Sequence, residues 1–221
     1  METKLVITGD GSTSLFIPDL DEHYHSIHGA IQESIHVFIN AGLIPILATK
    51  DEIQILEIGF GTGLNALLTG IESRNHTTSI QYTSIEKYPV SPEFINHLNF
   101  CTLLDIPNCR DLFMKIHGSE WGKMTNIEHN FFLNKIKSDF KEIKFNDTFD
   151  LIYFDAFAPS AQPELWTEEI FRIMYNALKK NGILVTYCAK GIVKRTMKSV
   201  GFEVIALPGP IGKREMTKAI K

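Results

Sequence analysis

Cysteine is scarce in this chain. The 221 residues include three cysteines, Cys101, Cys109 and Cys188, and their spacing matches no cysteine-based metal site. The beginning of the chain, Met1 to Lys4, also lacks the basic and then apolar pattern of an export signal. An odd number of cysteines without an export signal predicts a reducing, cytoplasmic environment.

Long apolar runs and internal repeats are missing as well. The apolar runs are interrupted before they reach the length of a membrane span, so we expect no transmembrane helix. The length fits one domain with a modest extension. We therefore predict an N-terminal extension over residues 1–50, packed on a catalytic domain over residues 51–221.

Histidine is concentrated in one polar segment, where His23, His25 and His28 lie close together. A metal site is the first interpretation. However, no nearby cysteine or helical histidine pair supports it, and Tyr24 and Ser26 interrupt the series. We expect no metal here and interpret the segment as a loop that borders a substrate pocket.

The formal net charge of −4 conceals a charge asymmetry along the chain. Residues 179–221 contain ten Lys and Arg against two Glu, a net charge of +8, so the remainder carries −12. A basic end on an acidic body favours a polyanionic partner that approaches from one side. The alternative is an ordinary solvated surface.

Local patterns predict several elements outside the main signals. Alternating apolar residues around Asp10-Gly11 predict a β-hairpin over residues 5–17. Apolar residues at helical spacing predict a helix over residues 30–43 that Gly42 ends, followed by a short connection over 44–47. Later, Asn181-Gly182 is expected to end a helix, and residues 217–221 to form a last edge strand.

The stretch 53–65 organises the chain. An apolar run over 53–58 predicts a buried strand, and a helix is predicted to begin at Leu64. Between them, Gly59, Gly61 and Gly63 let the backbone approach a ligand closely, since a Cβ would clash there. The order G-x-G-x-G differs from the dinucleotide pattern G-x-G-x-x-G. The alternative is an ordinary turn of an α/β protein.

Carboxylates follow the next predicted strands. Glu86 ends the strand 80–85 and can accept hydrogen bonds from both hydroxyls of a ribose. Asp139 follows the strand 131–136 as another strand-end carboxylate. A surface glutamate at a strand end is the alternative for Glu86.

The segment Phe149 to Pro159 is the second strong signal. A buried strand ends in Asp155, which would face a bound ligand because ligands lie outside the carboxyl ends of strands in open α/β sheets. Phe157 and Pro159 would form an apolar wall against a flat substrate. A helix cap or loop carboxylate is the alternative for Asp155.

Several separated segments together carry a family resemblance. They are Asp10-Gly11-Ser12, residues 23–29, Glu33, Ser34, Val37, Phe38, Glu57 with the glycine turn, residues 155–159, Trp166, Gly191, Arg195, Gly201-Phe202 and residues 212–216. The glycine turn with Glu57 ahead of it resembles motif I of class I S-adenosylmethionine-dependent methyltransferases. The whole set resembles the MnmC-type tRNA wobble-uridine methyltransferases, over nearly the full chain.

This resemblance implies an α/β, Rossmann-like class I methyltransferase fold with a mostly parallel sheet and helices on both faces. It implies S-adenosyl-L-methionine as cofactor and tRNA as partner. The expected reaction methylates the amine of 5-aminomethyl-(2-thio)uridine at the wobble position. The chain ends where the flavin domain of the bifunctional members would begin, so we expect another enzyme to supply the aminomethyl group.

The resemblance also implies roles for individual residues. Asp155 is the expected catalytic residue, which orients or deprotonates the amine. The other expected contacts are Glu57, Gly59, Gly61, Gly63, Glu86 and Asp139 to the cofactor, Tyr24, His25 and Phe157 to the uracil ring, and Lys194, Arg195, Lys213 and Arg214 to phosphates.

Three other functions remain open from the sequence. The first is a methyltransferase for a small-molecule or protein amine, which would not need the basic C-terminal end. The second is a polyamine synthase, which would transfer an aminopropyl group on a related fold. The third is a non-catalytic subunit, for which a degenerate glycine turn would be expected, and none is seen.

Overall fold

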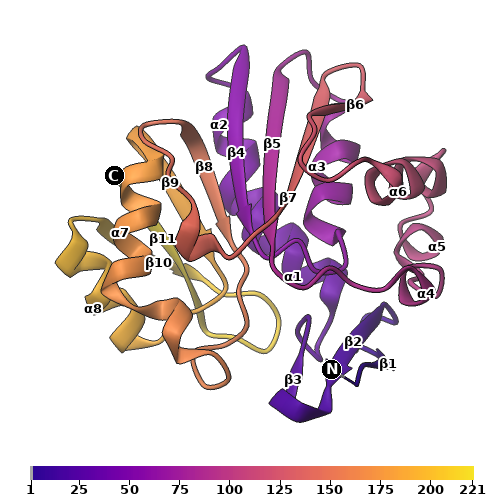
Figure 1. Ribbon diagram of the computed structural model, residues 1–221, viewed down its shortest axis with the longest axis horizontal. Coiled ribbons are helices and arrows are strands. Elements are labelled where there is room, and N and C mark those ends of the chain that lie inside the picture. Colours follow the sequence, from indigo (N-terminus) through magenta and orange to yellow (C-terminus); the bar gives the residue numbers. More distant parts are fainter. Residues whose placement is uncertain (1) are drawn as a thin grey trace.

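An eight-stranded sheet forms the centre of the computed structural model, which describes residues 2–221 (Figure 1). Met1, where the export-signal argument begins, lies outside the described residues. The strand order is β10-β11-β9-β8-β4-β5-β7-β6. The strands are β4 (Glu52–Ile58), β5 (Ser79–Glu86), β6 (Thr125–Glu128), β7 (Phe131–Lys137), β8 (Phe149–Phe154), β9 (Leu178–Thr186), β10 (Glu203–Pro208) and β11 (Glu215–Ile220).

The five strands from β9 to β7 in this order run parallel, whereas β6, β10 and β11 pair antiparallel with their neighbours. The predicted α/β fold with a mostly parallel sheet is confirmed. One element was assigned wrongly: β11 is not an edge strand but lies between β9 and β10. The chain turns back after β10, and β11 fills the space beside β9.

Helices cover both faces of the sheet (Figure 1). One face carries α1 (Ala30–Ser34), the π-helical segment Ile35–Leu43, α2 (Ile44–Leu47), α3 (Leu64–Ser73), α4 (Pro92–Ile95), α5 (Phe100–Leu104) and α6 (Cys109–Gly118). The other face carries α7 (Glu168–Ala177) and α8 (Gly191–Val200). Short 3-10 turns occupy Pro18–Leu20, Phe140–Glu142 and Pro163–Trp166.

Strand β4 shows why the sheet is covered on both sides. Ile53 and Ile55 belong to the hydrophobic core under α3, whereas Leu56 and Ile58 belong to the core under α7 and α8. A strand that is buried on both faces has no polar side, which explains its almost continuous apolar sequence. Glu57 is the exception within this run and is fully buried.

The helical run over residues 30–47 is continuous, so two predictions at its end are wrong. Gly42 does not end the helix, and residues 44–47 are helical as α2. A Cβ at Gly42 would lie 3.1 Å from a Val185 methyl group and 3.3 Å from the Tyr153 ring, so glycine permits close packing on the sheet. Pro45, which has no N–H to donate, lies where the π-helical segment passes into α2.

By length and composition, this run, Ala30–Leu47, could cross a membrane, contrary to the expectation from the apolar runs. Its mean hydropathy is 1.3, and 61% of it is buried inside the protein. Its apolar residues belong to the same core as Ile53 and Leu67, which accounts for its composition. The division at residue 50 stays a prediction, and this shared core argues against a separate unit there.

A second, three-stranded sheet precedes the helical run. It consists of β1 (Lys4–Ile7), β2 (Thr13–Ile17) and β3 (Glu22–His23), in that order and antiparallel. The predicted hairpin is therefore confirmed. This small sheet lies beyond one end of the main sheet (Figure 1), and the Asn99 side-chain oxygen accepts a hydrogen bond from the Thr13 amide at 2.7 Å.

Helix α7 also ends earlier than predicted. It stops at Ala177, and Asn181-Gly182 lies inside β9 rather than after a helix. The pairing of β8 with β9 shifts register between Phe149 and Leu151. Residues 179–182 thus extend β9 beside the end of β11, where the Asn181 amide donates to the carbonyl of Lys221 at 3.0 Å.

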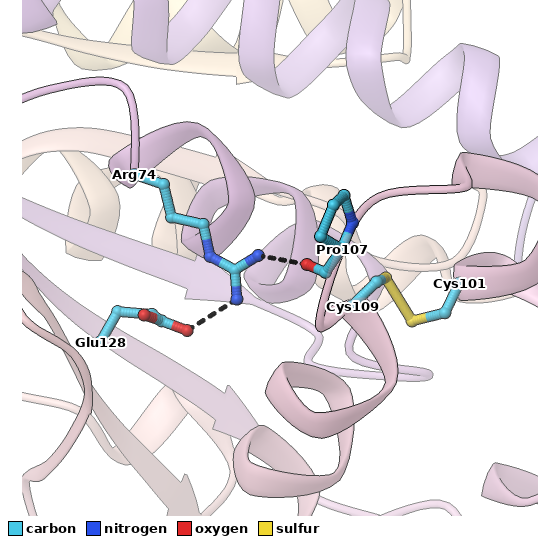
Figure 2. Close-up of a disulfide and its surroundings, with 5 residues drawn as sticks. All are labelled: Arg74, Cys101, Pro107, Cys109 and Glu128. Atoms are coloured by element: carbon cyan, nitrogen blue, oxygen red, sulfur yellow. Dashed lines mark hydrogen bonds and ion pairs between the residues drawn. A yellow bond between two sulfur atoms is a disulfide. The ribbon is translucent and has the colours of Figure 1, made fainter.

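Two of the three cysteines are joined, which the sequence argument did not foresee. Cys101 and Cys109 form a disulfide between α5 and α6, with 5.3 Å between their Cα atoms (Figure 2). Asp105 and Asn108 adopt left-handed backbone conformations, which reverse the chain between the two helices. Cys188 is free and buried. Nearby, Arg74 donates to the Pro107 carbonyl and pairs with Glu128, tying α3 to the α5–α6 connection and to β6.

Candidate functional site

A cavity of about 530 Å³ opens at the carboxyl ends of the parallel strands. Segments from both ends of the chain close it. Its walls come from residues 22–28, Glu33, residues 59–62, Leu64, Asn65, residues 85–88, residues 139–141, residues 155–158, Gln162, Glu164, Leu165, Tyr187, Gly212 and Lys213. Gly63, predicted as a cofactor contact, instead has its Cβ position 2.9 Å from His117 Nε2, outside this lining. The cavity therefore lies at the sheet edge that the sequence argument predicted, and Glu33, Asn65 and Tyr187 line it without having been predicted.

The glycine turn forms one wall of the cavity. Gly59, Gly61 and Gly63 all have positive φ angles, of 91°, 49° and 75°. A Cβ at Gly59 would lie 2.7 Å from the Asp155 carbonyl oxygen, so glycine lets this turn pass directly beside the end of β8. A Cβ at Gly61 would lie 3.2 Å from the Tyr24 ring, so this ring packs directly against the turn. Residues with a Cβ are strained at both positions.

Glu86 lines the cavity at the end of β5, as predicted. Its Oε2 accepts from the Gly61 amide at 3.1 Å, and its Oε1 accepts from the Tyr88 amide at 2.7 Å. Each carboxylate oxygen has a second lone pair, so both oxygens retain capacity for a ligand hydroxyl. The hydrogen bond from Gly61 also fixes the position of the glycine turn relative to the end of β5.

Asp139 also lines the cavity, but it is already engaged by protein groups. It accepts from the Lys141 amide at 3.0 Å and pairs with Lys87 at 2.9 Å. Although partial burial acts in the opposite direction, these bonds hold the pKa of Asp139 below its usual value. The residue is therefore an anionic acceptor at the rim rather than a buried ligand group.

Glu57 does not reach the cavity. It points from β4 toward α3, is fully buried, and accepts from the Ser84 hydroxyl at 2.6 Å, while its Oε1 is without a hydrogen-bond partner. Burial raises the pKa of Glu57 to about 8. The prediction that Glu57 contacts a ligand directly thus finds no support in this geometry, and its place is beneath the glycine turn.

Asp155 lies at the floor of the cavity, half-buried at the end of β8. Its Oδ2 accepts from the Asn65 side-chain amide at 2.8 Å, which orients the carboxyl group from the first turn of α3. Burial, together with the negative charge of Glu33, raises the pKa of Asp155 to about 7. A carboxyl group with this pKa can exchange a proton near neutral pH.

Lys213 lies inside the cavity, not on the outer surface where a phosphate contact was predicted. Its ammonium group forms an ion pair with Glu33 Oε2 and lies 4.1 Å from the centre of the Tyr187 ring. Tyr187 in turn donates to the Ala156 carbonyl at 2.8 Å. The loop between β10 and β11 is thereby attached to α1 across the cavity.

The predicted aromatic wall is present, and His25 lines the cavity beside it with both ring nitrogens engaged by protein groups. Tyr24 and Phe157 meet edge to face, with 5.1 Å between ring centres, and both line the cavity. His25 uses both ring nitrogens, Nδ1 with the Ser14 hydroxyl at 2.9 Å and Nε2 with the Thr62 hydroxyl at 3.1 Å. It thus joins the small sheet to the glycine turn, and burial lowers the pKa of His25 to about 4.

The four predicted phosphate contacts divide into two kinds. Lys194 pairs with Glu215 at 2.7 Å and Lys213 pairs with Glu33, so both are neutralised. Arg195 and Arg214 are exposed. Arg195 reaches back to the beginning of α8, where its guanidinium lies 3.3 Å from the Cβ position of Gly191, and Arg214 adjoins the cavity wall. Only this second pair remains a candidate for anion contact.

A second layer behind the glycine turn was not predicted. His117 Nε2 lies 3.1 Å from the Thr62 carbonyl, and Lys135 donates to the His117 carbonyl at 2.7 Å. The Lys135 ammonium also lies 5.5 Å from the ring centre of Phe60 and 5.0 Å from that of Trp121. Burial lowers the pKa of Lys135 to about 8. These contacts hold the turn in place from the side opposite the cavity.

Sequence signals for the missed residues differ in strength. Asn65 stands in the first helical turn after the glycines, a position that faces the site in this kind of turn. Its role could therefore have been predicted from the sequence. Glu33 and Lys213 are 180 residues apart, and no local pattern joins them.

Across residues 2–221, no group of three or more His, Cys, Asp or Glu side chains is arranged to hold a metal ion.

Comparison with known proteins gives a consistent picture. The sequence model of the family described as S-adenosyl-L-methionine-dependent methyltransferase matches residues 110–221. The bifunctional protein MnmC of Cupriavidus metallidurans, named for tRNA 5-methylaminomethyl-2-thiouridine biosynthesis, is 29% identical over 97% of this chain. The chain covers 33% of that protein, so it spans about a third of the length of such relatives.

Two solved structures are similar over almost the whole chain. MnmC2 from Aquifex aeolicus superposes with a TM-score of 0.77 at 25% identity, covering 99% of this chain and 69% of that one. Spermidine synthase from Thermotoga maritima superposes with a TM-score of 0.54 at 16% identity, covering 99% of this chain and 72% of that one. The second likeness concerns the fold alone.

Proposed function

Because this chain belongs to the S-adenosyl-L-methionine-dependent methyltransferase family, we propose that it methylates the primary amine of 5-aminomethyl-(2-thio)uridine at the wobble position of tRNA. The observation that carries this proposal is Asp155, an acidic group of raised pKa at the floor of an aromatic-walled cavity. The names of the MnmC relatives support the choice of substrate.

The cavity fits the cofactor. Glycine at 59 and 61 lets the turn lie directly against the end of β8 and the Tyr24 ring at the cavity wall, and Glu86 offers two carboxylate oxygens at the adjacent strand end. We assign Glu86 to the ribose hydroxyls and Asp139 to the adenine amino group. When bound, the cofactor supplies an electrophilic methyl group on a sulfonium sulfur. Glu57 and His25 support this wall from behind.

Asp155 is placed to handle the proton of the acceptor. The aminomethyl group enters largely as an ammonium ion, and the Asp155 carboxylate accepts one of its protons. The neutral nitrogen then uses its lone pair to form the N–C bond as the S–C bond breaks, which leaves a secondary ammonium product. Because burial raises the pKa of Asp155 to about 7, this carboxylate is a stronger base than an exposed aspartate.

Tyr24 and Phe157 would border the uracil ring. The wobble base lies in a single-stranded loop, so it can be turned out and stacked on aromatic side chains at low cost. The exposed Arg195 and Arg214 would contact phosphates beside the cavity. The proposal places the protein in the cytoplasm, where tRNA is, and requires an enzyme activity that produces the 5-aminomethyluridine.

The test is methyl transfer from radiolabelled S-adenosylmethionine into bulk tRNA from cells that lack this enzyme, followed by nucleoside analysis. We expect the label in 5-methylaminomethyl-type uridine. Label in another nucleoside would overturn the assigned position. No label in tRNA by a protein that still binds the cofactor would favour a small-molecule or protein amine, and aminopropyl transfer would then be assayed with the decarboxylated cofactor.

A further inference from the structure

We propose that Glu33 and Lys213 act as a positioning pair that keeps the acceptor end of the cavity at a single negative charge, carried by Asp155, and so matches it to one ammonium group. This inference rests on the proposed function and assigns a role to two residues that do not take part in the chemical step. It replaces the phosphate contact predicted for Lys213.

The geometry places the pair at the acceptor end rather than at the cofactor end. Glu33 and Lys213 line the same cavity as Asp155, and the Lys213 ammonium lies over the ring of Tyr187. Tyr187 is bonded to the carbonyl of Ala156, the residue after Asp155. The second Glu33 oxygen accepts from the Ser26 amide at 3.2 Å, so the carboxyl group is held from both sides.

Each member of the pair needs the other for electrostatic reasons. Glu33 is only 8% exposed, and an unpaired carboxylate at this depth would compete with Asp155 for its proton and for the substrate ammonium. Lys213 alone would repel that ammonium. Together they add no net charge, and one negative charge remains on Asp155 to face the incoming cation.

Other charged and titratable groups interact with Asp155 but do not change this balance. They are Glu57 from β4, Tyr82 from β5 and Tyr187 from the end of β9. Burial keeps the pKa of each of these three groups high, so they are mostly neutral near pH 7. The other charged groups that line the cavity are Glu22, Glu86, Lys87, Asp139, Lys141 and Glu164. Of the charged groups in the lining, Glu33 and Lys213 are the two that act on the pKa of Asp155.

The pair also joins distant parts of the chain. Lys213 belongs to the loop between β10 and β11, and Glu33 belongs to α1. In the same region, His36 Nε2 lies 2.8 Å from the Pro208 carbonyl, and a Cβ at Gly212 would fall within 2.1 Å of the His28 ring. The loop thus rests on the N-terminal segment, which fixes Lys213 toward Glu33 rather than toward solvent.

The experiment is a charge cycle with Lys213→Met, Glu33→Gln, the double variant and Lys213→Arg. The Asp155 titration is followed by carbon NMR of aspartate-labelled protein with S-adenosylhomocysteine bound, and its signal is assigned with Asp155→Asn. We expect Lys213→Met to raise the Asp155 pKa by roughly one unit and Glu33→Gln to lower it similarly. The double variant and Lys213→Arg should return it close to the parent value.

Kinetics on tRNA provide the second measurement. The acidic limb of the pH–rate profile should move in the same directions, and Glu33→Gln should raise KM for tRNA about tenfold with a smaller effect on kcat. If Lys213→Met instead weakens tRNA binding and lowers its salt dependence without moving the Asp155 titration, the pair is overturned and Lys213 is a phosphate contact.

The two proposals fail in distinguishable ways. If the parent protein does not methylate tRNA but the variants show the expected shifts of the Asp155 titration, the proposed substrate is wrong and the role of the Glu33–Lys213 pair is supported. A parent that is active on tRNA but shows an unchanged Asp155 titration in every variant overturns the pair alone. If Lys213→Met does not fold, Glu33→Gln and the double variant still test the pair. A shift of the Asp155 pKa in Glu33→Gln that is reversed in the double variant supports it, and an unchanged pKa in both overturns it.

Discussion

Glu57 is the clearest example of a residue whose burial disfavours its usual ionised state. Its carboxyl group is fully buried beneath the glycine turn, with one oxygen bonded to the Ser84 hydroxyl and the other without a hydrogen-bond partner. Burial raises the pKa of Glu57 from 4.5 to about 8. The native state therefore retains a proton that the unfolded state loses between these two pH values.

Glu57→Gln should consequently change the pH dependence of stability. Above pH 4.5, the unfolded parent binds fewer protons than the native parent, so its free energy of unfolding falls as the pH rises toward 8. Glu57→Gln has no carboxyl group at this position, so its free energy of unfolding does not show this decrease. We expect its advantage over the parent to grow by up to about 1.4 kcal/mol per pH unit. Urea unfolding at several pH values between 5 and 8 measures this difference.

Glu52→Gln is the matched control, because Glu52 is on the same strand but exposed. Its difference from the parent should not depend on pH in this range. His25 and His117, whose pKa values burial lowers to about 4, affect parent and variants equally and cancel in the comparison. A pH-independent difference for Glu57→Gln would show that Glu57 is ionised in the native protein.

Asp155→Asn should separate turnover from cofactor binding. The substitution preserves the size of the side chain but removes the proton acceptor, so kcat for tRNA should fall by about 10²–10⁴-fold. The Kd for S-adenosylhomocysteine should change by less than about threefold, since Glu86 and the glycine turn are untouched. Single-turnover methylation and calorimetry measure the two effects. Equal losses in both would place Asp155 in the cofactor site.

At the scale of elements, α8 and the loop between β10 and β11 carry exposed cations in the basic C-terminal part of the chain. Arg195→Ala and Arg214→Ala should each weaken tRNA binding. For each phosphate contact that is lost, the slope of log K against log salt should become about 0.7 less negative. Lys180→Ala is the control, because Lys180 is exposed at the opposite, amino end of β9. Fluorescence titrations at several salt concentrations provide the slopes.

The same substitutions discriminate between substrate classes. A methyltransferase of small amines should keep its kcat/KM when Arg195 or Arg214 becomes alanine. Ion pairs already neutralise Lys179, Lys194, Lys213 and Lys221. The sequence charge of +8 therefore overstates the field that a nucleic acid would meet at this end of the chain.

Element boundaries were predicted best where local chemistry alone decides them. The Asp-Gly turn and the glycine turn each fix a change of direction within a few residues, and both were located correctly. The end of helix 30–47 was not, because packing of Gly42 on Val185 and Tyr153 outweighs the low helix propensity of glycine. Likewise, the disulfide depends on the turn between α5 and α6, which brings Cys101 and Cys109 together.

At the scale of the whole molecule, cofactor binding should stabilise the fold against heat. A ligand at 100 times its Kd adds about 2.7 kcal/mol, which for a chain of this size corresponds to a rise in Tm of roughly 5–10 °C. Differential scanning fluorimetry with S-adenosylhomocysteine measures it. Glu86→Ala should lose most of this rise at the same ligand concentration, because two charge-assisted hydrogen bonds are removed. Lys123→Ala, which removes an exposed charge outside the cavity, should retain it.

The sequence by itself determined the fold class and the centre of the site. Buried parallel strands have continuous apolar sequences, and ligand-facing residues follow their carboxyl ends, so Gly59, Gly61, Glu86 and Asp155 were readable from order along the chain. Only the tertiary structure decided which charged residues meet. Lys213 was placed on the surface because its neighbours are basic, yet the chain returns after β10 and brings it to Glu33. Electrostatic pairing acts across space, and the sequence records no distance between residues that are far apart in the chain.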